Sequence, residues 1–160
     1  MKLKVFMLVV CLGSALIVLA GNENMNKTPF NTVQEVFAAL SVYDLDKIKS
    51  HSTEDFQLLE VGEVWDFDVI ENIFKSSKPP IQRRNWFSVI KEENFGDVVW
   101  ISYWNRAEYT REEGKSERAW LESAVLVKQA GEWKLQMLHS TRIEPEQLPK
   151  DIQMQEYISQ

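Results

Sequence analysis

Four long segments in the second half of the chain, each rich in β-branched and aromatic residues, constrain the fold more than any other feature. They occupy residues 82–94, 97–111, 117–129 and 132–143. Short polar stretches around Gly96, Gly114 and Gly131 separate them. Such residues favour strands, and short connections that contain glycine favour antiparallel hairpins. The pattern therefore predicts a largely antiparallel sheet of long strands.

The part of the chain that precedes Pro79 and Pro80 has helical periodicity instead. We expect three helices there, beginning at Thr32, at Asp44 and at Asp66 or Asp68, because these polar side chains can cap a first helical turn. Apolar residues repeat at helical spacing after each of them. A short strand over residues 55–61 separates the second helix from the third. Helices followed by hairpin-joined strands predict an α+β fold.

The N-terminus has the charge and hydropathy pattern of a secretory signal peptide. Two lysines precede an apolar run from Val5 to Ala20, and polar residues follow from Gly21. We expect cleavage after Ala20 and export to the periplasm or the extracellular space. An uncleaved anchor is the alternative, but the run is short for a membrane span and Gly13 and Ser14 interrupt it.

The only cysteine of the chain, Cys11, lies within this expected signal peptide. Its removal leaves no disulfide, no thiol nucleophile and no cysteine ligand for a metal. A lipoprotein attachment site at Cys11 is the alternative, but Val10 is bulkier than that processing site accepts. With two histidines far apart in the sequence and no glycine-rich phosphate loop, we expect neither a metal nor a nucleotide cofactor.

The formal net charge of −6 becomes more negative when the signal peptide and its lysines leave. This charge disfavours nucleic acid and anionic membrane as partners. The expected organisation is a signal peptide over residues 1–20, a tether over 21–30, one domain over 31–143 and a weakly attached tail over 144–160. We expect no stable membrane span after processing.

The last predicted hairpin carries the candidate catalytic residues. If Ala130 and Gly131 form a two-residue turn, then Glu122 faces His139, and the two share one side of the sheet. On a face otherwise built of apolar residues, a carboxylate that orients an imidazole is a candidate acid–base couple.

Two alternatives to this couple remain open. A three-residue turn with Gly131 in a bulge position would shift the pairing by one and turn Glu122 to the opposite side of the sheet. Even in the first register, a Glu–His pair in a half-buried sheet is often only a satisfied polar contact.

Aromatic residues define the candidate ligand pocket and a second surface. The expected pocket residues are Trp100, Trp104, Trp120, Met137 and Thr141. Both faces of the strand over residues 98–106 are apolar, which predicts that helices cover one side of the sheet and a partner subunit covers the other. Arg83 and Arg84 either bind an anion or mark an exposed strand start.

Several short motifs of the chain occur together in a known superfamily. They are Glu122-Ser123, Gly131-x-Trp133 and Leu138-His139-Ser140-Thr141-Arg142 in the last hairpin, and Val36-Phe37-x-Ala39, Tyr43-Asp44-x-Asp46 and Asp55-Phe56 in the helical half. With these motifs, residues 31–143 resemble the nuclear-transport-factor-2-like superfamily, which includes SnoaL-like cyclases, steroid isomerase and the association domain of calmodulin-dependent kinase. The chain is most similar to its small exported bacterial members.

The resemblance implies a cone in which a curved sheet wraps around helices and leaves a pocket between them, with dimers common through the outer side of the sheet. The resemblance does not identify active-site residues, because the catalytic residues of the steroid isomerase and of the epoxide hydrolases with this fold cannot be matched to positions in this sequence. Three hypotheses follow: a pocket that binds a small, partly apolar molecule, a cofactor-free lyase or isomerase using Glu122 and His139, and a homo-oligomeric interaction module.

Overall fold

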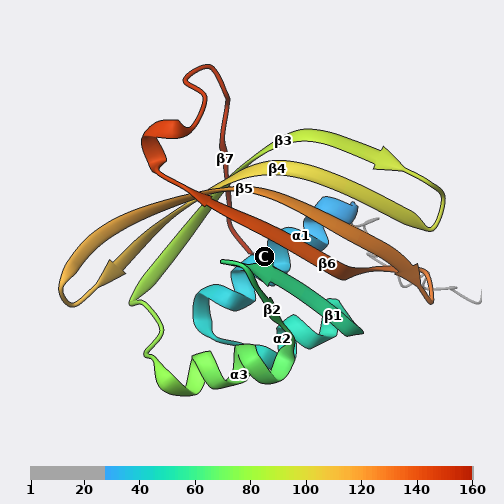
Figure 1. Cartoon of the computed structure of the whole chain (residues 1–160), viewed down its shortest axis with the longest axis horizontal. Coiled ribbons are helices and arrows are strands. Elements are labelled where there is room, and N and C mark those ends of the chain that lie inside the picture. The colour runs from blue at the N-terminus through green and yellow to red at the C-terminus, as the bar shows by residue number, and fades with distance from the viewer. Residues whose placement is uncertain (1–27, 160) are drawn as a thin grey trace, which may run out of the picture.

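The computed structural model describes residues 28–159 and shows an α+β fold, as predicted (Figure 1). The first half contains α1 (Pro29–Val42), α2 (Leu45–Ser50), β1 (Ser52–Glu60), β2 (Glu63–Trp65) and α3 (Phe67–Ser76). The second half contains β3 (Gln82–Asn94), β4 (Val98–Arg111), β5 (Gly114–Gln129), β6 (Glu132–Ile143), a 3-10 turn η1 (Pro145–Gln147) and β7 (Gln155–Tyr157). No helix within residues 28–159 combines the length and the apolar character that a membrane crossing requires. The expected signal peptide lies outside the described residues.

The strands form one sheet in the order β2-β1-β6-β5-β4-β3-β7. Neighbouring strands are antiparallel except for β1 and β6, which run parallel. The pairing of β3 with β4 skips Ile90, and the pairing of β5 with β6 skips Gln136. Such bulges bend a strand and increase its twist. Figure 1 shows the sheet curving around the helices.

The first helix begins earlier than the sequence predicted. Thr28 is the N-cap, its hydroxyl accepts from the backbone N–H of Asn31 at 3.3 Å, and Pro29 occupies the first helical turn, where its missing N–H costs nothing. The predicted cap Thr32 lies inside the helix and donates to the carbonyl of Trp133. The pattern was misread because a second Thr stands four residues upstream with equally suitable neighbours. The caps Asp44 and Asp66 are confirmed.

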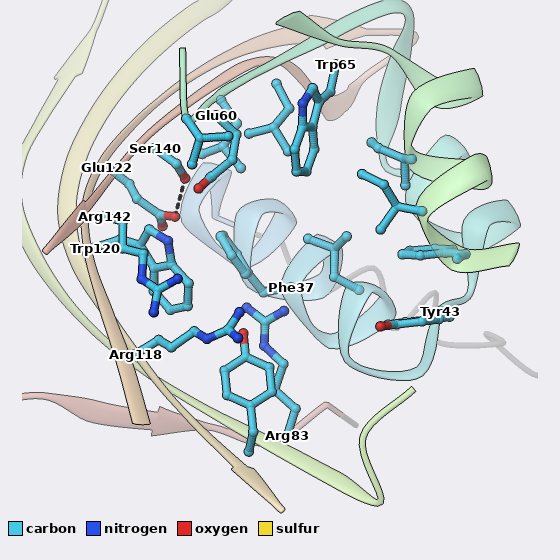
Figure 2. Close-up of a pocket in the computed structure, with 18 of the residues that line it drawn as sticks. Phe37, Tyr43, Glu60, Trp65, Arg83, Arg118, Trp120, Glu122, Ser140 and Arg142 are labelled. Atoms are coloured by element: carbon cyan, nitrogen blue, oxygen red, sulfur yellow. Dashed lines mark hydrogen bonds between the residues drawn. The ribbon is translucent and has the colours of Figure 1, made fainter. Parts of the chain in front are cut away.

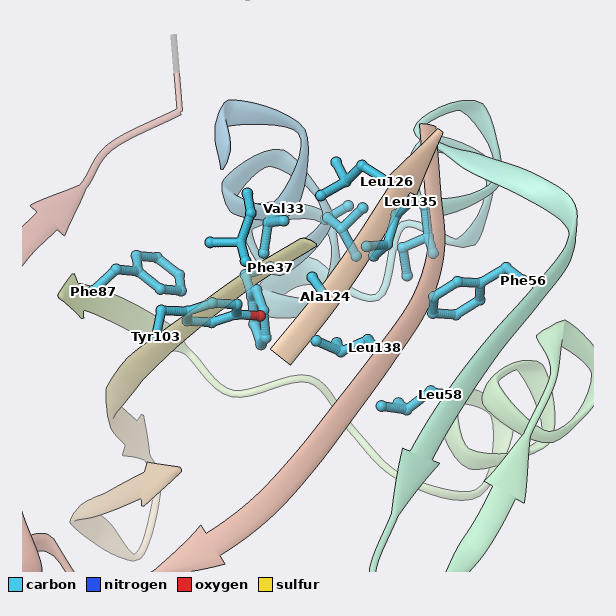
Figure 3. Close-up of a cluster of buried hydrophobic side chains, with 14 of the residues drawn as sticks. Val33, Phe37, Phe56, Leu58, Phe87, Tyr103, Ala124, Leu126, Leu135 and Leu138 are labelled. Atoms are coloured by element: carbon cyan, nitrogen blue, oxygen red, sulfur yellow. The ribbon is translucent and has the colours of Figure 1, made fainter. Parts of the chain in front are cut away.

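The main core lies between α1 and the inner face of the sheet (Figure 3). Val33 and Phe37 of α1 meet side chains that alternate along the strands, because every second residue of a strand points to the same face. These inner-face residues include Phe87, Tyr103, Ala124, Leu126, Leu135 and Leu138. The core therefore covers one part of the inner face and leaves the part nearer α3 for a cavity.

The C-terminal segment joins the sheet, although weak attachment was expected. β7 pairs with the outer edge of β3, and the guanidinium of Arg84 donates to both carboxylate oxygens of Glu156 at 2.7 and 2.6 Å. The hydroxyl of Tyr157 donates to Glu35 of α1, which also pairs with Lys47. The segment thus covers a strand edge that would otherwise expose unpaired backbone groups.

Candidate functional site

A cavity of about 330 Å³ lies between the inner face of the sheet and the helices (Figure 2). Its polar wall comes from alternate residues of five strands, which the period of two brings to one face. The polar and charged side chains of this wall are Glu60, Arg83, Tyr109, Arg111, Arg118, Trp120, Glu122, Ser140 and Arg142. Its remaining lining comes mainly from α1, α3 and the segments beside them.

The end of the cavity near α3 is apolar. Its lining residues are Phe37, Leu40, Tyr43, Leu58, Val61, Trp65, Ile70, Ile73, Phe74 and Pro80. The rings of Tyr43 and Phe74 are stacked with centroids 4.3 Å apart, which fixes the end of α1 against α3. Asp66 caps α3 and so sets where this apolar helix face begins.

Three residues of neighbouring strands form a row across the polar wall. Ser140 of β6 is paired with Glu60 of β1 on one side and with Glu122 of β5 on the other. The hydroxyl of Ser140 donates to Oε1 of Glu122 at 2.6 Å, and Nδ2 of Asn105 donates to Oε2 at 3.1 Å. Two carboxyl groups therefore flank a single hydroxyl.

Burial raises the pKa of both carboxyl groups. Glu122 is 3 % exposed, and loss of hydration raises its pKa to about 7, although the hydrogen bonds from Ser140 and Asn105 favour the ionised form. Burial also raises the pKa of Glu60, while Ser140, Trp120 and the positive charges of Arg142 and Arg83 act in the opposite direction. At neutral pH, Glu122 is thus close to half protonated.

Guanidinium groups form the other part of the polar wall. Arg83 lies over the rings of Tyr109 at 5.1 Å and Trp120 at 5.9 Å, and Arg118 also lies over Tyr109 at 5.1 Å. Figure 2 shows Arg83, Arg118 and Arg142 extending into the cavity. Within residues 28–159, none of these three arginines forms an ion pair. These guanidinium groups therefore lie beyond ion-pair distance of the cavity carboxyl groups Glu60 and Glu122, on which Arg83 and Arg142 act from further away.

The structure does not form the predicted couple of Glu122 and His139. Of the two turns that the sequence left open, the two-residue turn is present, because Ala130 and Gly131 both have positive φ and Lys128 pairs with Trp133. The bulge at Gln136 then shifts the rest of β6 by one residue, so His139 pairs with Ser123. His139 is consequently exposed on the outer face, whereas Glu122 lies in the cavity.

The same shift decides where the predicted pocket residues lie. Trp120 lines the cavity as predicted. Trp100, Trp104, Met137 and Thr141 are absent from its lining and belong to the outer face of the sheet, together with His139. The structure thus separates Trp120 from the other four residues of the expected pocket, which share the outer face of the sheet.

The functional residues that the sequence reasoning missed are Glu60, Ser140, Arg118 and Arg142. Glu60 reaches the site only through the parallel pairing of β1 with β6, which no local pattern predicts. Ser140 and Arg142 were on the other face in the expected register. Arg83 had been noted as a possible anion-binding residue. Across the described part of the chain, no group of three or more His, Cys, Asp or Glu side chains could hold a metal ion.

Comparison of the structure with solved structures finds a known fold. The ketosteroid isomerase-like protein from Erwinia carotovora atroseptica superposes with a TM-score of 0.60 at 17% identity, covering 78% of this chain and 99% of that one. The CaMKII hub of S. rosetta also gives 0.60 at 17% identity, covering 71% and 93%. The association domain of C. elegans CaMKII gives 0.56 at 16% identity, covering 70% and 91%.

These neighbours share the nuclear-transport-factor-2-like fold. The chain therefore has this fold, which confirms the resemblance seen in its sequence, and it stands structurally beside both the isomerase-like proteins and the kinase hub domains. No model of a known sequence family and no curated protein sequence matches the chain.

Proposed function

We propose that the chain binds a small, partly apolar molecule that carries an anionic group. The observation that supports this function is the arrangement of the cavity, with guanidinium groups that form no ion pair at one end and aromatic and aliphatic side chains at the other. Arginine binds carboxylate and phosphate oxygens through parallel N–H groups, and a half-enclosed apolar surface strengthens that attraction. The apolar end would receive the body of the ligand.

The volume sets the size of this ligand. A cavity of about 330 Å³ has the volume of about eleven molecules of liquid water, at roughly 30 Å³ each. It lies at the lower end of the range of about 300–1,000 Å³ for small-molecule sites. Benzoate, octanoate and 2-naphthoate are suitable probes, and the corresponding neutral amides serve as shape controls.

Trp120 lines the cavity, so its fluorescence reports on occupancy, and calorimetry gives the affinity. We expect carboxylates to bind and the matching amides to bind at least about tenfold more weakly, because a hydrogen bond to a charged group contributes about 1.5–3 kcal/mol. Arg118→Gln should reduce carboxylate affinity to a similar extent. Equal affinities for carboxylate and amide would overturn the proposal.

Arg106→Gln is the matched control for Arg118→Gln. Arg106 is paired with Ala119, next to Arg118 in the sheet, but its side chain is on the outer face and pairs with Glu117. The two variants remove the same charge at adjacent positions of the sheet. If the ligand binds in the cavity, Arg118→Gln should weaken carboxylate binding and Arg106→Gln should not.

We also propose self-association through the outer face of the sheet. Trp100, Val125 and Met137 are paired in one row of this face, and Trp104, Leu121 and Thr141 are paired in another. Leu121 is 39% exposed at the centre of the second row. An apolar sheet face of this extent is typical of a surface that a partner covers. The structural likeness to a CaMKII hub and to an association domain supports a second copy as that partner.

Sedimentation velocity tests this association directly. We expect the domain to sediment as a dimer or a larger assembly, and Leu121→Arg to shift it to the monomer. Glu113→Arg, in the exposed turn between β4 and β5, adds the same side chain away from the outer face and should leave the assembly intact. A wild-type monomer at high concentration would refute self-association.

Export remains the third part of the proposal. The order of lysines, apolar run and polar residues at the N-terminus supports a signal peptide over residues 1–20. Intact-mass measurement of the protein expressed with its own N-terminus tests it, because cleavage after Ala20 leaves Gly21 as the first residue. Retention of the full chain inside the cell would contradict export.

A further inference from the structure

In the row of Glu60, Ser140 and Glu122, two carboxyl groups share one hydroxyl between them, while Asn105 donates to Glu122 and Trp120 to Glu60 from the sides of the row. The Ser140 hydroxyl has one proton and gives it to Glu122. Directly opposed side chains on neighbouring strands have Cβ atoms about 4.5–5.5 Å apart, so Glu60 and Glu122 are separated only by Ser140. A row of this kind is most stable when at least one carboxyl group carries a proton.

The residues behind Glu122 already contain an acceptor for that proton. Within the described chain, Oδ1 of Asn105 is buried without a hydrogen-bond partner, while its Nδ2 donates to Glu122. Rotation of the amide by about 180° exchanges these two atoms. Oδ1 then accepts from a protonated Glu122, so the network accommodates the neutral acid as well as the anion.

The charged and titratable groups that face this pair come from every strand around it. They are Arg83 of β3, Tyr103, Tyr109 and Arg111 of β4, Arg118 of β5 and Arg142 of β6. The helical side of the cavity contributes the Tyr43 hydroxyl, at the end of α1, and otherwise apolar side chains. The carboxyl pair is thus the only acidic group within the cavity lining of the described residues.

An anion that binds the guanidinium groups comes close to these carboxyl groups. Arg83 and Arg142 act electrostatically on Glu60, and Arg83 also acts on Glu122, so the cations that attract the ligand are those that stabilise the carboxylates. A bound anion competes for these cations and adds a repulsive negative charge to a poorly hydrated site. When Glu60 or Glu122 takes up a proton, it no longer needs the cations for itself and no longer repels the bound anion.

We propose that the pocket takes up its anionic ligand together with a proton, with the anion on the guanidinium groups and the proton on the carboxyl groups beside Ser140, chiefly on Glu122. The net substance bound is therefore a small carboxylic acid, delivered as carboxylate and proton at separate positions. This inference rests on the proposed function, because it requires that an anion binds at all.

The pKa of Glu122 determines how strongly ligand binding depends on pH. Its pKa of about 7 in the free protein means that binding near neutral pH takes up about half a proton at this residue. When the bound state holds the proton throughout, affinity falls about tenfold between about pH 6 and about pH 8. The ligand carboxylate does not titrate in this range, so it adds no pH dependence of its own.

Calorimetry of 2-naphthoate binding measures the proton directly. Titrations in bis-Tris and in Tris, cationic buffers that differ in ionisation enthalpy and do not compete for the guanidinium groups, give the number of protons bound, and titrations from about pH 6 to about pH 8 give the affinity. We expect uptake of about half a proton at neutral pH and the tenfold fall in affinity. Glu122→Gln, which imitates the neutral acid, should keep the affinity of low pH and lose most of both effects.

The control variant is Glu117→Gln, which removes a carboxylate of the same strand that pairs with Arg106 rather than facing the cavity. It should retain proton uptake. Binding of 2-naphthoate without proton uptake would overturn this inference and leave the proposed function intact. Failure of all the carboxylates to bind at any pH would overturn both. The wild-type titrations in two buffers decide the matter even if Glu122→Gln does not fold.

Discussion

Replacing Glu122 with glutamine keeps the shape of the side chain but removes its ability to ionise, so the substitution measures the free-energy cost of burying the carboxylate. In the folded protein the pKa of Glu122 is raised from 4.5 to about 7 by burial. Between these values the folded state binds more protons than the unfolded state, so the contribution of Glu122 to stability falls as pH rises and levels off above the folded-state value. At about 1.4 kcal/mol per unit of pKa, the full titration costs the wild-type protein about 3 kcal/mol.

Urea unfolding followed by tryptophan fluorescence measures this cost at about pH 5 and about pH 8. Glutamine cannot ionise, so the difference between the two proteins in the free energy of unfolding should change by about 2 to 3 kcal/mol between these pH values, in favour of Glu122→Gln at the higher one. The lowered pKa values of Glu35, Asp55 and Glu156 act below this window. Burial also raises the pKa of Glu60, and this effect is present in both proteins.

Parallel stability profiles of the two proteins would refute the reasoning. They would mean that Glu122 is well hydrated or fully compensated when ionised, contrary to its exposure of 3%. A profile in which the wild type gains stability relative to the variant as pH rises would have the wrong sign and would indicate an ion pair instead.

Three further predictions concern the folded sheet. Leu138→Ala should lower the free energy of unfolding by about 2–5 kcal/mol in urea denaturation, because Leu138 is buried, whereas His139→Ala on the exposed face should change it by less than about 0.5 kcal/mol. Equal effects would contradict the observed register. Gly131→Ala should cost about 1 kcal/mol by the same assay, because its φ of 86° is unfavourable for residues with a Cβ atom. Deletion of Gln136 should leave the domain folded by circular dichroism, because it removes only the residue that the pairing skips and keeps Leu138 opposite Ala124 on the inner face; an unfolded deletion variant would show that the bend at the bulge is itself required.

The sequence predicted the architecture well because the signals for it are local. Alternating β-branched and aromatic residues, short turns and polar caps such as Asp44 and Asp66 act within a few residues of each other. The turn at Ala130 and Gly131 was located by the same kind of signal, although its length was left open. The β6 bulge was not, because Gln136 carries no turn signal and its place in the ladder depends on β1 and β5 on either side. One unpaired residue therefore moved the candidate site to the other face.

The polar lining of the cavity could not be predicted for a related reason. Glu60 and Ser140 are far apart in the sequence, and only the parallel pairing of β1 with β6 places them next to each other. The raised pKa of Glu122 is likewise a property of the enclosed site rather than of the residue. The sequence shows which carboxyl, hydroxyl and guanidinium groups the chain contains. The pairing of strands that are distant in the sequence determines which of these groups meet in the cavity.

The parallel pairing of β1 with β6 also has a consequence for how the chain acquires its structure. Leu58 is paired with Leu138, roughly 80 residues later, and contacts of such large sequence separation slow folding because a long loop must close first. During synthesis the helices and β1 emerge well before the strand that holds them to the sheet. The polypeptide should therefore stay unfolded until nearly all of the domain has left the ribosome.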